Sequence, residues 1–232
     1  IKALNNISFS IKPGKTLAIV GKTGSGKSTI VQLLSRLYDV NKGDILIDGK
    51  KINEINLNSL RSQTGSVPQE VFLFSDTIAN NISFGTFGNE PQSNINKIKW
   101  AAEQAVVSKN IESFENDYDT KVGERGITLS GGQKQRISIA RALLKNPKIL
   151  IFDDCLSAVD TETEEKILSN LISIMKEKTT IIVSHRISTI KHADHILLIE
   201  NGEIIEEGTH DSLIKLGNKY ADLLQKQLVK KA

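Results

Sequence analysis

Short apolar runs alternate along the chain with longer segments in which apolar residues recur at helical spacing. Apolar runs occupy Leu17–Val20, Ile149–Phe152 and Thr180–Ser184, while residues 28–37 and 161–175 have the helical spacing. Runs of this length are typical of strands that are buried on both faces of a sheet. The alternation therefore predicts an α/β fold with a mostly parallel sheet.

Two further segments predict β-hairpins, which would add an antiparallel portion to the sheet. Residues 44–48 and 50–52 flank Gly49, and residues 196–199 and 203–205 flank Asn201-Gly202. Asn-Gly is favoured in the tight primed turns that join antiparallel strands. An alternating segment, Ile7-Phe9-Ile11, also suggests a strand.

The middle of the chain has a different pattern. Residues 76–144 show little strand character and carry helical segments at 95–107 and 133–144. We expect a helical subdomain there, inserted into an α/β core made of residues 1–75 and 145–232. The tail predicts one amphipathic helix over 211–228, whose apolar stripe packs on the core. That stripe contains Leu213, Leu216, Tyr220, Leu223 and Leu224.

Composition narrows the class of protein. The chain has 232 residues, with 30 Lys and Arg against 27 Asp and Glu, giving a net charge of +3. This balance gives no argument for nucleic-acid binding, which needs a clustered basic face. The single cysteine, Cys155, excludes an intramolecular disulfide and favours a reducing compartment. No apolar run approaches the roughly 20 residues that cross a bilayer.

A glycine-rich segment follows the first apolar run. It reads Gly21, Lys22, Thr23, Gly24, Ser25, Gly26, Lys27 and Ser28, with Thr29 next in the helical segment. This matches the phosphate-binding pattern G-x-x-x-x-G-K-[ST] in its strand-to-helix context. Its backbone N–H groups and the helix N-terminus favour phosphate oxygens. Lys27 should reach the outer phosphates, and the Ser28 hydroxyl should face Mg²⁺. The alternative is a glycine-rich turn without a ligand, which rarely has this spacing and context.

Two adjacent carboxylates end a later apolar run. Asp153 and Asp154 follow Ile149–Phe152, so they should lie at the carboxyl edge of the sheet, where ligands bind in open α/β folds. Asp153 is the candidate Mg²⁺-associated carboxylate. Taken alone, the pair could equally cap the helix that follows, but the phosphate-binding pattern favours the metal role.

A second candidate anion site precedes the helical segment at 133–144. Leu129-Ser130-Gly131-Gly132-Gln133 offers a hydroxyl, glycine N–H groups and a helix N-terminus. Without other context, a plain helix cap would explain it.

Taken together, these motifs resemble the nucleotide-binding domain of ATP-binding-cassette (ABC) transporters, in the order of that family and over almost the whole chain. The motifs are residues 21–28, Gln69 within Val67-Pro68-Gln69, Leu129–Gln133, Asp153-Asp154, Ser157–Asp160 and His185. Residues 74–78 and 119–126 also resemble segments of exporter-type members.

The resemblance implies a P-loop NTPase core with a mixed, mostly parallel sheet. It also implies a mechanism in which two domains stack head to tail and trap two ATP molecules. Ser130, Gly131, Gly132 and Gln133 would bind the ATP that the partner domain holds, and Asp160 would lie at the dimer seam. Gln69 would join Ser28 at Mg²⁺, while His185 would contact the γ-phosphate and the attacking water.

The resemblance also implies partners. Residues near 70–84 and 119–126 would touch the transmembrane domains of the same exporter, at the cytoplasmic face of the cell membrane. The transmembrane region and the aromatic residue that stacks on adenine would precede Ile1 in a longer chain, since residues 1–11 contain only Phe9.

One residue departs from the family pattern. Members that hydrolyse ATP well have Glu directly after the Mg²⁺-binding Asp, whereas this chain has Asp154. Asp is one methylene shorter, and a displacement of about 1 Å can cost on the order of 10²-fold in rate. We predict a slow site in a heterodimeric exporter, paired with a different chain that carries Glu. The alternative is a homodimer in which the backbone adjusts and Asp154 functions.

Three functions remain compatible with these residues. The first is an ATPase domain that powers export. The second is a soluble ABC-type ATPase acting on DNA or the ribosome, although such proteins usually carry tandem cassettes or a long coiled coil. The third is a regulatory domain that holds ATP with little turnover. Measured turnover of the partnered dimer separates the first from the third.

Overall fold

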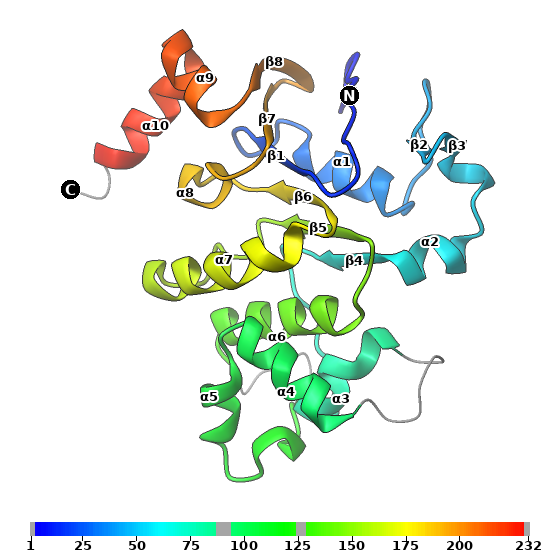
Figure 1. Cartoon of the computed structure of the whole chain (residues 1–232), viewed down its shortest axis with the longest axis vertical. Helices are drawn as coiled ribbons and strands as arrows, with labels where there is room; N and C mark the ends of the chain where they lie inside the picture. The colour runs from blue at the N-terminus through cyan, green and yellow to red at the C-terminus, as the bar shows by residue number, and fades with distance from the viewer. Residues whose placement is uncertain (1–2, 87–93, 124–128, 230–232) are drawn as a thin grey trace.

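The computed structural model describes residues 3–86, 94–123 and 129–229 (Figure 1). Its centre is a six-stranded sheet with the strand order β4-β5-β6-β1-β7-β8. All neighbouring strands run parallel except β7 and β8, which form an antiparallel hairpin. The strands are β1 (Thr16–Val20), β4 (Thr64–Val67), β5 (Ile149–Asp153), β6 (Thr179–Val183), β7 (His195–Glu200) and β8 (Glu203–Gly208).

A separate two-stranded antiparallel ribbon is formed by β2 (Leu46–Ile47) and β3 (Lys50–Lys51). The predicted mixed, mostly parallel sheet with two hairpins is therefore confirmed. The α-helices are α1 (Lys27–Leu34), α2 (Leu57–Gln63), α3 (Ile78–Ser83), α4 (Ile95–Gln104), α5 (Ser108–Glu112), α6 (Gly131–Leu144), α7 (Thr161–Met175), α8 (Ile187–Ile190), α9 (His210–Leu216) and α10 (Lys219–Val229).

The sheet is buried on both faces, which explains why its strands are apolar throughout. On β1, Ala18 and Val20 join one apolar cluster, while Leu17 and Ile19 join a second cluster on the opposite face. Successive side chains of a strand point to opposite faces. Helix α1 contributes Ile30 to the second cluster, and most of the other helices pack on the first.

Helix α6 connects the central sheet to a group of helices. It packs against α3 and α4 and also against β4. In Figure 1, α3, α4, α5 and α6 lie together below the sheet. The assignment of residues 76–144 to a subdomain remains a prediction, because one continuous apolar cluster includes both Ile98 of α4 and Leu150 of β5.

The C-terminal segment corrects one prediction. It forms two helices, because α9 ends at Gly217, whose backbone is left-handed with φ 65°. A left-handed residue is the common end of a helix, and glycine adopts it without steric cost. The break changes the direction of the apolar stripe. Tyr220 is fully buried, whereas Leu216 is 58% exposed.

The N-terminal segment corrects a second prediction, that of a strand at residues 7–11. Residues 7–11 form no strand, although Ile7, Phe9 and Ile11 do pack against the apolar cluster on the α1 face of the sheet.

No helix among the described residues is both long and apolar enough to cross a membrane.

Candidate functional site

Four loops that carry predicted site residues lie at one edge of the sheet. They follow β1, β4, β5 and β6, all of which are parallel and belong to the contiguous part of the sheet. The loop after β1 is the glycine-rich segment, and Asp153 is the last residue of β5. Gln69 and His185 each lie two residues beyond the ends of β4 and β6. This common carboxyl edge is where open α/β sheets bind ligands.

The glycine-rich loop wraps around the ammonium group of Lys27. Lys27 Nζ donates hydrogen bonds to the carbonyl oxygens of Gly21 and Lys22, at 2.8 and 2.7 Å. Burial lowers the pKa of Lys27, and the carboxylates of Asp154 and Asp153 act in the opposite direction. A positive charge is thus held inside the loop, beside two carboxylates.

The backbone of the loop requires its glycines. A Cβ on Gly21 would lie 2.2 Å from the carbonyl oxygen of Ile199, and Gly26 has φ 104°. Gly26 precedes α1 and gives its first turn no side-chain cap. The first N–H groups of a helix otherwise lack partners, so this helix end favours an anionic ligand.

Asp153 and Ser28 form the oxygen-rich part of the site. The Ser28 hydroxyl is hydrogen-bonded to the carboxylate of Asp153. Burial raises the pKa of Asp153, and this hydrogen bond opposes that effect. A carboxylate, a hydroxyl and the exposed carboxamide of Gln69 are hard oxygen donors, which suit Mg²⁺ when phosphate oxygens complete the coordination. The residues present therefore fit the predicted metal.

Asp154 is held in an unusual backbone conformation beside His185. Its φ is 46°, in the left-handed region, and its N–H donates to the carbonyl of Val183 at 2.8 Å. The Asp154 carboxylate lies 2.8 Å from Nδ1 of His185. The side chain of His185 is about half exposed, at 53%. The structure thus brings these two predicted residues into direct contact.

The motif at 129–133 caps α6. The Ser130 hydroxyl accepts from the N–H of Gln133 at 3.2 Å, and the Gln133 side chain accepts from the N–H of Ser130 at 2.8 Å. No hydrogen bond of the described residues joins this motif to the chain's own glycine-rich loop. Within this chain the motif therefore acts as a helix cap.

Helix α6 also bonds to the segment that follows the two aspartates. Gln135 in α6 donates to the Ser157 hydroxyl and accepts from the N–H of Ala158. Asp160 is exposed and caps α7, accepting from the N–H of Thr163 at 2.9 Å. This hydrogen bond lowers the pKa of Asp160.

We expect Gly132→Ala to destabilise the fold and Gly131→Ala to leave it intact. A Cβ on Gly132 would lie 2.9 Å from the carbonyl oxygen of Ala158, whereas on Gly131 the nearest atom is 3.5 Å away. Overpacking of this kind costs about 1–3 kcal/mol, which corresponds to a fall of about 2–4 °C in Tm for each kcal/mol. Thermal unfolding of both variants measures this. Equal melting temperatures would contradict the predicted difference.

The two segments that resemble exporter-type members lie side by side. Ile78 donates to the carbonyl of Thr120 at 3.0 Å, and Val122 donates to that of Asp76 at 2.9 Å. Residues 124–126 of this prediction lie outside the described residues. Phe74, the first residue of the segment at 74–78, contacts the rings of Phe72 and Phe84.

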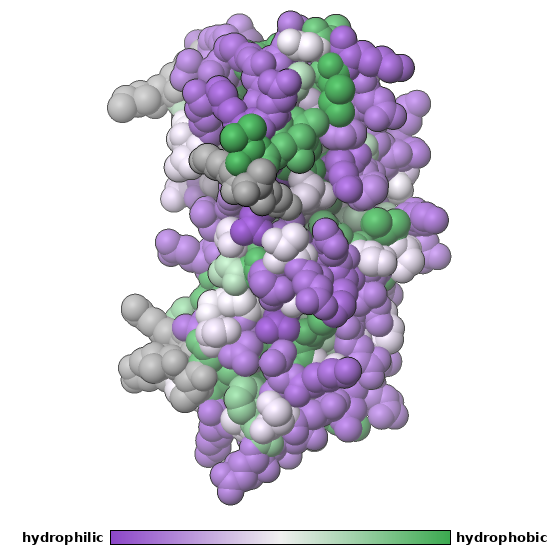
Figure 2. All heavy atoms as spheres, turned by 90° about the vertical axis from the view of Figure 1, so that its left-hand side faces the viewer, coloured by the Kyte–Doolittle hydropathy of each residue, from purple (hydrophilic) through white to green (hydrophobic). Residues whose placement is uncertain are grey.

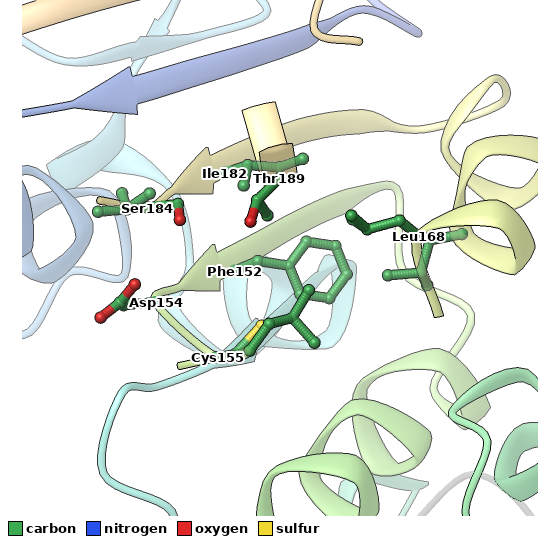
Figure 3. A pocket seen from close by; sticks show the side chains of 10 residues that line it. Phe152, Asp154, Cys155, Leu168, Ile182, Ser184 and Thr189 are labelled. Carbon is green, nitrogen blue, oxygen red and sulfur yellow. The ribbon is translucent and has the colours of Figure 1, made fainter. Parts of the chain in front are cut away.

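A small apolar cavity lies behind Asp154 (Figure 3). Its volume is about 10 Å³, and its lining includes Phe152, Cys155 and Leu168. A space of this size holds at most about one water molecule, so it offers no room for a nucleotide. Burial raises the pKa of the Cys155 thiol, which keeps it protonated and unreactive.

Sequence reasoning missed Glu164, Arg186 and Gln227. The Glu164 side chain is only 3% exposed and pairs with Arg186, directly after His185. Gln227 in α10 bonds to the backbone on both sides of Arg186. These residues are far apart in sequence and match no local pattern, so no sequence signal pointed to their contact.

The fold and this site define a P-loop nucleotide-binding domain, with a phosphate loop after β1 and a carboxylate at the end of β5. The ABC transporter family model matches residues 4–157. The chain belongs to the ABC transporter family.

Individual relatives agree with this assignment. An ATP-dependent lipid A-core flippase of Photobacterium profundum is 48% identical over 95% of this chain and 37% of its own length. The human ATP-binding cassette sub-family B member 6 is 46% identical over 97% of this chain and 26% of its own length. The chain thus spans well under half of these relatives.

A solved structure gives the same result for the fold. The structure of a bacterial Atm1-family ABC exporter with ATP bound superposes with a TM-score of 0.92 and 43% sequence identity. The match covers 97% of this chain and 39% of that exporter chain. The predicted resemblance to an exporter-type nucleotide-binding domain is confirmed.

Proposed function

We propose that this chain is the ATP-binding and ATP-hydrolysing domain of an exporter, at the cytoplasmic face of a membrane. One observation carries the proposal: Lys27, Ser28 and Asp153 come together at the carboxyl edge of the sheet. The relatives named as a flippase and an exporter support the link to transport. Transmembrane domains of the same exporter are the proposed partners, reached through residues near 70–84 and 119–126.

The glycine-rich loop is the proposed nucleotide site. Residues 21–26 and Thr29 present backbone groups to the phosphates, and Lys27 exchanges its bonds to loop carbonyls for bonds to the outer phosphates. Ser28, Asp153 and Gln69 would hold Mg²⁺. When bound, this ion neutralises charge that develops on the phosphates.

The second part of the proposal is a head-to-tail dimer. Ser130, Gly131, Gly132 and Gln133 would contact the ATP held by the partner domain. The bonds of this motif within its own chain support the dimer. The motif caps α6, and among the described residues it makes no hydrogen bond to the glycine-rich loop of the same chain. Asp160, exposed at the start of α7, would lie at the seam.

The third part concerns the rate. We propose that His185 orients the attacking water and the γ-phosphate, and that Asp154 makes this site slow. The Asp154 carboxylate is bonded to His185 and sits on a left-handed residue. A shorter carboxylate in this place should position water less well than Glu. The proposed partner is a different chain that carries Glu, so that one site of the pair hydrolyses ATP efficiently.

Titration calorimetry with ATP and Mg²⁺ tests the core of the proposal. We expect one ATP to bind per chain, with an affinity that weakens when Mg²⁺ is removed, because Ser28 and Asp153 then lose their shared ion. Size-exclusion chromatography of the same samples should show ATP-dependent dimers with the partner domain. Folded protein that takes up no ATP would refute the proposed function.

A further inference from the structure

His185 lies on a short loop between β6 and α8, and among the described residues its side chain bonds to Asp154. The position of the imidazole therefore depends on the backbone of residues 184–186. Three other elements hold this backbone. Ser184 donates from its N–H to the carbonyl of Ile19 in β1 at 3.2 Å, which fixes the start of the loop.

Helix α7 fixes the end of the loop. The buried carboxylate of Glu164 pairs with the guanidinium of Arg186 and accepts from the Thr189 hydroxyl at 2.6 Å. Arg186 also donates to the carbonyl of Ser157 at 3.1 Å. These bonds act through side chains. Of the peptide groups beside His185, the N–H of Arg186 donates to the Ser184 hydroxyl at 3.0 Å, and two others bond to a further partner.

That partner is Gln227 on the C-terminal helix α10. Its carbonyl oxygen accepts from the N–H of Ile187 at 2.9 Å, and its amide nitrogen donates to the carbonyl of His185. Ile187 begins α8, a helix whose N-cap residue provides no side-chain cap. Gln227 therefore caps α8 and restrains His185 with the same group.

We propose that Gln227 is a positioning residue for His185, so that helix α10 sets the rate of ATP hydrolysis at this chain's own site. The proposal rests on the proposed function of His185. A carboxamide is needed because it both donates and accepts, and a carboxylate can only accept. Loss of either bond removes a restraint on the backbone that carries His185, and displacement of a reacting group by about 1 Å can cost on the order of 10²-fold in rate.

The placement of Gln227 on α10 makes this contact long-range. Gln227 is 42 residues from His185 in sequence. Tyr220, at the start of the same helix, is fully buried and anchors α10 to the core. Figure 2 shows the side of the molecule that carries α10 in Figure 1, a mainly hydrophilic surface with patches of apolar side chains.

Two variants separate the two bonds. Gln227→Glu keeps the size of the side chain and the bond from Ile187 but loses the donor to His185, and Gln227→Leu loses both. Gln225→Leu, at an exposed position on the same helix, is the matched control. The assay is single-turnover ATP hydrolysis by the full-length exporter with its partner. The kinetic phase that Lys27→Met abolishes belongs to this chain's site.

We expect the rate constant of that phase to fall about tenfold in Gln227→Leu and by a smaller factor in Gln227→Glu. Both effects should be smaller than the roughly 10²-fold cost of a 1 Å displacement, because other bonds still hold the loop. The ATP concentration for half-saturation should stay within about twofold, because the glycine-rich loop is untouched. Gln225→Leu should match the wild type. A fall in affinity with an unchanged rate constant would overturn the proposal.

The His185→Ala background separates positioning from general stability. If Gln227 acts through His185, Gln227→Leu should slow the reaction no further in that background. An equal slowing in both backgrounds would overturn the inference. If His185→Ala alone leaves the rate unchanged, the proposed role of His185 fails instead. If His185→Ala slows the reaction and Gln227→Leu does not, only the role of Gln227 is refuted.

Discussion

Replacing Lys27 with Met should abolish measurable ATP hydrolysis at this site. The ammonium is held by the carbonyls of Gly21 and Lys22 and is the cation of the loop. Removing one preorganised group that stabilises transition-state charge costs about 10²–10³-fold in rate. A hydrogen bond to a charged group contributes about 1.5–3 kcal/mol, so ATP affinity should also weaken about tenfold or more. Single-turnover kinetics and calorimetry measure the two effects.

The fold should survive this substitution. Burial already lowers the pKa of Lys27, so removal of the charge relieves a desolvation cost while it removes the hydrogen bonds from Nζ to the loop. We expect the free energy of unfolding to change by about 1 kcal/mol or less. Lys12→Met, at an exposed lysine outside the loop, serves as the control. Wild-type turnover by Lys27→Met would refute the assignment of the glycine-rich loop.

Replacing Asp154 with Glu should accelerate hydrolysis at this site by up to about 10²-fold. The added methylene extends the carboxylate by about 1 Å, the scale on which catalytic placement controls rate. The measurement is the rate constant of the same single-turnover phase, in the exporter with its partner. Binding of ATP and Mg²⁺ should be little changed, because the proposed ligands of both are Lys27, Ser28 and Asp153.

This gain in rate should carry a cost in stability. Asp154 has φ 46°, a left-handed conformation that Asp tolerates better than longer residues do. We expect Asp154→Glu to lower the free energy of unfolding by about 1 kcal/mol, measured by urea denaturation. Asp154→Asn provides the matched comparison, because it suits this backbone but carries no charge. An unchanged rate in Asp154→Glu would favour a homodimer in which Asp154 already functions.

The sheet illustrates how much of the fold local sequence determines. Strands β1, β5 and β6 are buried on both faces, so their apolar runs were visible without the structure. Strand β4, with the sequence TGSV, has no such run. It lies at the edge of the sheet and needs Gly65, because a Cβ there would lie 2.7 Å from the ring of Pro147. The glycine in this strand is therefore explained by its contact with Pro147, which is distant in sequence.

The ends of the helices also differ in how well local sequence predicts them. Asp160 and Ser130 cap helices through atoms three residues away, so their sequence signals are local. The break at Gly217 was missed, because a periodic apolar stripe continues through it in sequence. The position of the glycine near the end of the periodicity was the available signal.

The sequence by itself determined the parallel α/β core and predicts the residues of the proposed phosphate site, because glycine-loop chemistry requires fixed residue types at fixed spacing. It also identified Asp154 as the departure from the family pattern. Only the tertiary structure decided that Asp154 contacts His185 and that Gln227 bonds to the loop which carries that histidine. These contacts join strands and helices that are far apart in the chain, and long-range packing leaves no periodic pattern in the sequence.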